Sequence, residues 1–79
     1  MTIYKIKYLL DMDEDYYLFL ADAIDAGYHY IDRIAEEEGD WDDVMITYAK
    51  NCLKHNHEFK GVVRIAEIEA RASRNSANW

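Results

Sequence analysis

The first residues of the chain alternate between apolar and basic side chains. One face of the segment is apolar, with Tyr4, Ile6, Tyr8 and Leu10, and the other carries Lys5 and Lys7. Because a period of two is typical of a β-strand, residues 3–10 are predicted to be extended. A lone strand leaves its backbone groups unpaired. This segment therefore pairs with another strand of the chain, pairs across a dimer, or forms a short helix instead.

Apolar residues then recur at intervals of three and four between residues 15 and 38. They are Tyr17, Leu20, Ala21, Ile24, Tyr28, Ile31, Ile34 and Ala35. This spacing predicts an amphipathic helix over 15–38, with Gly39 suited to its C-cap. Gly27 costs the helix about 1 kcal/mol relative to Ala. The apolar face keeps its phase across Gly27, which favours one helix over two.

A second helix is predicted over residues 40–54, beginning at Asp40. Its apolar face contains Trp41, Val44, Met45, Tyr48 and Cys52. Lys50 and Lys54 suit its C-terminal end, where the helix dipole favours positive charge.

Charged residues indicate a third helix over residues 57–73. Lys60, Arg64, Glu67, Arg71 and Arg74 are separated by four, three, four and three residues, the spacing of one helix face. Val and Ile are also frequent in strands, so a strand within residues 62–72 stays open. The predicted fold is mainly α, a compact three-helix domain with an extended segment at 3–10. The alternative is an α+β fold in which the N-terminal strand pairs with a C-terminal strand or across a dimer.

The length of 79 residues corresponds to one domain over residues 1–79. Residues 73–79 are expected to fray. Cys52 is the only cysteine, so no internal disulfide forms. The sequence contains neither a signal peptide nor an apolar run long enough to span a membrane, and a cytoplasmic location is expected.

Charge is distributed unevenly along the chain, whose net charge is -7. Residues 11–43 contain one base, Arg33, and thirteen carboxylates: Asp11, Asp13, Glu14, Asp15, Asp22, Asp25, Asp32, Glu36, Glu37, Glu38, Asp40, Asp42 and Asp43. Both flanking segments are net basic. The acidic field opposes direct binding to nucleic acid or to an anionic membrane, so the expected partner is basic.

Four carboxylates of the first predicted helix share one face: Asp22, Asp25, Asp32 and Glu36, with His29 between them. They recur about every 7 Å along the axis, roughly half the phosphate density of a nucleic-acid strand. Asp15 extends this stripe, and Tyr16, Phe19 and Tyr30 are candidate aromatic anchors beside it. A solvated face kept acidic for solubility is the alternative. Like charges at this spacing cost about 0.2–0.5 kcal/mol per pair, which favours a use for them.

The patterns that calcium binding, zinc binding or a catalytic serine requires are incomplete in this sequence. Asp11, Asp13, Asp15 and Asp22 match four positions of an EF-hand loop, but Tyr16 occupies the position that requires Gly. Cys52, His55, His57 and Glu58 match no four-ligand zinc spacing. The only serines, Ser73 and Ser76, lie in the tail, away from any orienting base. No catalytic residue, metal or cofactor is therefore predicted, and the chain is not expected to be an enzyme.

These features predict a non-catalytic inhibitor that blocks a basic, nucleic-acid-handling protein with its acidic helix. In size, acidity and carboxylate stripe the chain resembles small phage-encoded inhibitors of bacterial defence, of the DNA-mimic anti-restriction and anti-CRISPR kind. The resemblance implies a CRISPR effector or a restriction subunit as partner, in a bacterial host cell. One alternative is a structural or regulatory oligomer, such as a homodimer, whose acidic and basic helices pair. A second is a metal-binding domain.

Overall fold

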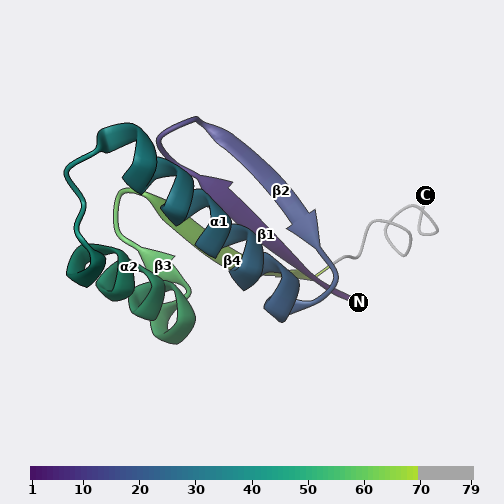
Figure 1. The fold of residues 1–79 in the computed structure, drawn as a ribbon. Helices are drawn as coiled ribbons and strands as arrows, with labels where there is room; N and C mark the ends of the chain where they lie inside the picture. The colour runs from purple at the N-terminus through teal and green to yellow at the C-terminus, as the bar shows by residue number, and fades with distance from the viewer. Residues whose placement is uncertain (70–79) are drawn as a thin grey trace, which may run out of the picture.

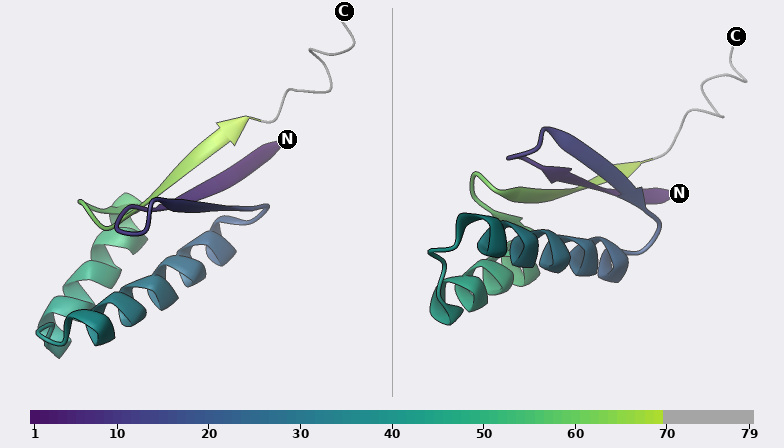
Figure 2. Two further views of the ribbon diagram at one scale, coloured as in Figure 1. Left: turned by 90° about the horizontal axis from the view of Figure 1, so that it is seen from above. Right: turned by 45° about the horizontal axis from the view of Figure 1, so that its top comes forward.

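The computed structural model of the chain describes residues 1–69, which form two layers. Both helices lie on one face of a four-stranded antiparallel sheet (Figures 1 and 2). The elements are β1 (Thr2–Tyr8), β2 (Asp13–Tyr17), α1 (Leu20–Glu38), α2 (Asp43–Asn56), β3 (Glu58–Phe59) and β4 (Val63–Glu69). Across the sheet the strands are ordered β2-β1-β4-β3. The fold is α+β, and the prediction of a mainly α domain with three helices is wrong.

A β-hairpin replaces the predicted third helix in its described part, and residues 70–73 of that helix lie outside the described residues. Strands β3 and β4 are joined by a tight turn, in which the Val62 N–H donates to the Phe59 carbonyl at 3.0 Å. Gly61 in this turn has φ 83°, a value that favours glycine. Val63 and Ile65 are buried and Arg64 between them is exposed, which is the period of a strand.

Strand β4 pairs with β1, and Ile6 lies opposite Ile65. The N-terminal strand thus pairs with a C-terminal strand, the arrangement held open as the alternative. The pairing satisfies the backbone groups that a lone strand would leave without partners. The basic helix that the oligomer alternative requires is not present in the described residues, because its sequence up to residue 69 forms this hairpin.

Helix α1 begins at Leu20, five residues later than the predicted start at residue 15. The residues before it form β2, an edge strand that pairs with β1 in the register Lys5 to Tyr16. At its other end the prediction is confirmed, since Gly39 adopts φ 77° and its N–H donates to the Ala35 carbonyl at 3.0 Å. The helix also runs without a break through Gly27, as predicted.

Helix α2 begins after Asp42, not at Asp40 as predicted. Asp42 is the N-cap, and its Oδ1 accepts a hydrogen bond from the Met45 N–H at 2.9 Å. A side-chain cap of this kind satisfies a backbone donor that the helix leaves free. The helix runs to Asn56, two residues beyond its predicted end, with Lys54 and His55 in its last turn.

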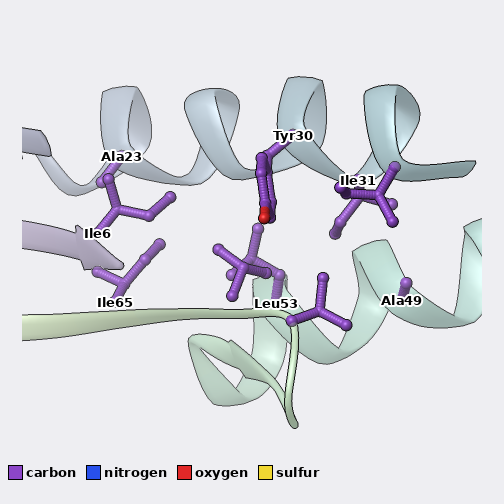
Figure 3. Close-up of a cluster of buried hydrophobic side chains, with 10 residues drawn as sticks. Ile6, Ala23, Tyr30, Ile31, Ala49, Leu53 and Ile65 are labelled. Carbon is purple, nitrogen blue, oxygen red and sulfur yellow. The ribbon is translucent and has the colours of Figure 1, made fainter. Parts of the chain in front are cut away.

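The core lies between the helices and the sheet (Figure 3). Its largest fully buried side chains are Ile6, Ile31, Leu53 and Val63. Helix α2 contributes Ala49 and Leu53, whereas Val44 and Tyr48 of its predicted apolar face are 77% and 60% exposed. Helix α2 therefore has a buried apolar face and a second apolar face that points outward.

Candidate functional site

All thirteen carboxylates of residues 11–43 are exposed. Eight of them form no ion pair with another residue of the described chain, namely Asp13, Asp15, Asp22, Glu36, Glu38, Asp40, Asp42 and Asp43. Three of these eight accept local hydrogen bonds, because Asp42 caps α2, Asp15 accepts from the Tyr8 hydroxyl at 2.9 Å and Asp13 accepts from the Glu14 N–H at 2.8 Å. The rest face solvent without an opposite charge nearby, so most of the negative field stays uncompensated.

The carboxylates of α1 lie on its solvent side, opposite the residues that it buries. Asp22 and Glu36 have no ionic partner in residues 1–69, and Asp25 Oδ2 lies 3.5 Å from His29 Nε2. Asp32 differs, since its Oδ1 lies 2.8 Å from Lys50 Nζ of α2. The predicted stripe of four is therefore three carboxylates available to a partner and one that joins the two helices.

A hollow of about 310 Å³ lies where the β1–β2 turn meets α1. It is lined by Tyr8, Asp11, Asp13, Ala26, His29, Tyr30 and Arg33. Arg33 donates to the Asp11 carboxylate, and its guanidinium lies 5.1 Å from the centre of the Tyr30 ring. The one base of the acidic segment is thus engaged with a carboxylate of the turn. The hollow lies between the carboxylates of the turn, Asp11 and Asp13, and the His29 and Arg33 side chains of α1.

The rings of Tyr8 and Tyr30 pack together at this hollow, with their centres 4.8 Å apart. Burial raises the pKa of Tyr8, and its hydrogen bond to Asp15 raises it further. Burial, and then the nearby Asp11 carboxylate, also raise the pKa of Tyr30. The Tyr30 hydroxyl is buried and has no hydrogen-bond partner in the structure as described. Since Tyr30 is only 5% exposed, it supports the hollow and is not the exposed aromatic anchor that the sequence suggested.

The other predicted site residues are divided between faces. Asp15 and Tyr16 belong to strand β2, not to the start of a helix. In the sheet register Asp15 lies opposite Ile6, on the helix side, and Tyr16 lies opposite Lys5, on the open side. Phe19 is 67% exposed at the N-cap of α1. Asp15 therefore belongs with the α1 carboxylates, whereas Tyr16 does not.

The open face of the sheet carries the opposite charge. Lys5, Lys7 and Arg64 share this face in adjacent strands, with Lys7 opposite Arg64. Glu14 lies beside them, its Oε1 3.9 Å from Lys5 Nζ. Glu58 lies opposite Arg64 on this face, so the face carries three bases and two acids and lacks the acidic excess of α1. The sequence could not show this difference while β4 was taken as a helix. We use "acidic surface" for Asp11, Asp13, Asp15, Asp22, Asp25 and Glu36.

Within residues 1–69, the side chains of the two partial metal-ligand patterns fall on different elements. No three His, Cys, Asp or Glu side chains gather there as metal ligands. The four aspartates that resemble part of an EF-hand loop are spread over a turn, strand β2 and helix α1. The partial ligand set around Cys52 spans the end of α2 and the start of β3, with Cys52 half-buried.

No protein family, curated protein or solved structure matches this chain. Among the helices of residues 1–69, neither is long and apolar enough to cross a membrane.

Proposed function

We propose that the chain is a non-catalytic inhibitor whose acidic surface occupies the nucleic-acid-binding groove of a basic protein. A CRISPR effector or a restriction subunit is the kind of partner meant. Such proteins bind nucleic acid mainly through Lys and Arg contacts to phosphates. A protein that presents carboxylates in place of phosphates competes for those contacts.

The observation that supports this proposal is the uncompensated exposure of the acidic surface. Each of its six carboxylates is exposed, and within residues 1–69 the only bases in contact with them are Arg33 on Asp11 and the exposed His29 beside Asp25. In a small domain, an equivalent surface kept only for solubility would intersperse both signs. Here three bases, Lys5, Lys7 and Arg64, lie together on the open face of the sheet instead.

The geometry favours a groove-shaped partner. The acidic surface includes the solvent side of α1 and, beyond the hollow that His29 and Arg33 line, the turn and β2. A 19-residue helix is about 28 Å long, a length comparable to about eight base pairs of duplex. Electrostatic steering would make association fast, and added salt would slow it.

The test is affinity capture with a variant matched in charge. Asp22→Asn/Asp25→Asn/Glu36→Gln removes three carboxylates from the acidic surface. Glu58→Gln/Glu67→Gln/Glu69→Gln removes three from outside it and gives the same net charge. Each immobilised protein is exposed to a nuclease-treated bacterial lysate and eluted with duplex DNA.

The proposal expects the wild type and the Glu58, Glu67 and Glu69 variant to capture the same proteins, and duplex DNA to elute them. The Asp22, Asp25 and Glu36 variant should lose them. If both variants lose them equally, net charge and not the acidic surface is responsible. If no captured protein is eluted by DNA, the inhibitor proposal is wrong.

A further inference from the structure

The outward face of α2 carries a cluster of apolar side chains, which we call the α2 patch: Trp41, Val44, Met45, Tyr48, Cys52 and Phe59. The Phe59 ring of β3 contacts both Trp41 and Tyr48, since its centre lies 5.9 Å from that of Trp41 and 6.0 Å from that of Tyr48, both edge-to-face. Val44 is 77%, Tyr48 60% and Met45 37% exposed. Contiguous apolar surface of this kind on a small protein marks an interaction site.

The composition of the α2 patch is that of a protein interface. Trp, Tyr, Phe and Met are enriched at the centres of such interfaces, and Trp and Tyr provide much of their binding energy. Trp41 and Phe59 are half-buried and also pack against the core. The core does not account for Val44, Met45 and Tyr48, because α2 fills it with Ala49 and Leu53 from its other side. The core itself is small, with eleven buried apolar residues in the part of the chain described, and a domain of this size gains stability from association.

The charges at the two ends of α2 indicate which partner fits. Asp42 and Asp43 lie at its N-terminal end, and Lys54 and His55 in its last turn. An antiparallel copy of the same helix would bring each acidic end to a basic end. It would also oppose the two helix dipoles favourably. A partner of one charge sign would be attracted at one end and repelled at the other.

We infer that the α2 patch is the interface of a homodimer, in which two α2 helices pack antiparallel about a two-fold axis near Tyr48. Such an interface is isologous, so the same residues serve both copies. Tyr48 of one copy then packs near Tyr48 of the other, and Val44 of one copy faces Cys52 of the other. The α2 patch and the acidic surface share no residue, so the inference does not rest on the proposed function.

The mass of the full chain in solution tests whether the dimer forms. Analytical ultracentrifugation should give twice the monomer mass, and the dimer should persist at about 0.5 M NaCl, where exposed charge pairs are largely screened. Val44→Glu should yield a monomer. Leu18 is similarly exposed, at 61%, but lies outside the α2 patch, so Leu18→Glu should leave the dimer intact. A wild-type chain that is monomeric at about 1 mM overturns the inference.

Oxidative cross-linking tests the antiparallel arrangement. Val44→Cys should give a disulfide-linked dimer through native Cys52, and Val44→Cys/Cys52→Ser should not. Within one helix these positions are about 12 Å apart, too far for an internal disulfide. A parallel arrangement would instead place Cys52 against its own counterpart and cross-link the wild type. A dimer with that behaviour would overturn the two-fold geometry.

Discussion

Lys50 Nζ of helix α2 lies 2.8 Å from Asp32 Oδ1 of helix α1. The same ammonium group lies 5.8 Å from the centre of the Tyr28 ring. Lys50 therefore joins the two helices at their solvent side. Asp32 therefore differs from the other carboxylates of the predicted stripe, because Lys50 compensates its charge within the molecule.

This ion pair predicts a difference in stability between two carboxylates of one helix. Asp32→Asn should lower the free energy of unfolding by about 0.5 kcal/mol, the usual value of a partly exposed pair. Glu36→Gln should leave it unchanged or raise it, because Glu36 is exposed, has no ionic partner in residues 1–69 and lies near the negative end of the helix dipole. Urea unfolding at low and high salt measures both. Equal effects of the two substitutions would show that Lys50 does not hold Asp32 in solution.

Gly27 predicts a substitution whose effect depends on its neighbour. A Cβ atom at this position would overlap Leu53 Cδ2 and lie 3.3 Å from Ile6 Cδ1. Gly27→Ala gains about 1 kcal/mol in helix propensity, but overpacking costs about 1–3 kcal/mol. The free energy of unfolding should therefore fall by about 1 kcal/mol.

The same substitution should become neutral or stabilising when Leu53 is shortened. In a Leu53→Val background the Cδ2 atom is gone, and the gain in helix propensity remains. The double-mutant cycle of Gly27→Ala and Leu53→Val, followed by urea unfolding, measures the coupling. A loss of stability of the same size in both backgrounds would refute the close packing of Gly27 against Leu53.

High pH should destabilise the protein through Tyr8. Burial and the Asp15 carboxylate raise the pKa of this phenol in the folded state. Unfolded tyrosine ionises near about pH 10. Tyr8 of the folded chain consequently keeps its proton to higher pH than Tyr8 of the unfolded chain. Its contribution to the free energy of unfolding is complete below about pH 10 and is lost as the pH rises through the folded pKa.

Tyr8→Phe should make the fall in the free energy of unfolding above about pH 10 shallower. Asp15→Asn should have a smaller effect in the same direction, because it removes the second cause of the shift and leaves the burial of Tyr8. Urea unfolding at a series of pH values measures the slope. A slope unchanged by Tyr8→Phe would assign the alkaline loss to other groups.

Sequence patterns predicted those elements that have one buried and one exposed face. Helix α1 buries Ala23, Gly27 and Ile31 on one side, so its period of 3.6 was visible and Gly39 marked its end. Strand β1 was visible for the same reason, since Ile6 is buried between half-buried lysines.

The two errors arose where that contrast is weak. Strand β2 is an edge strand of five residues, four of them exposed. It shows no alternation, so its Tyr17 was assigned to the apolar face of the helix that follows. In β4, Glu67 is exposed although its register places it opposite Tyr4 on the helix side. The ends of β1 and β4 splay away from the helices there (Figure 2). Because both faces of β4 are exposed there, charged residues occur on both, and the spacing of Arg64 and Glu67 matched that of a helix face.

The same limit applies to the candidate site, since only features within one element could be predicted from spacing. The stripe on α1 was correctly placed on an exposed face. The internal pairing of Asp32, the hollow at Tyr30 and the α2 patch depend on contacts between elements, which spacing along one element does not contain.

The most direct test of the acidic surface is displacement of DNA from a captured partner. Fluorescence anisotropy of a labelled duplex bound to that partner is followed while each variant is added. The wild type and the Glu58, Glu67 and Glu69 variant should displace the duplex equally well. Asp22→Asn/Asp25→Asn/Glu36→Gln should need roughly 10- to 100-fold more protein, with an unchanged melting temperature. Equal displacement by all three proteins would contradict the proposal that these carboxylates take the place of phosphates.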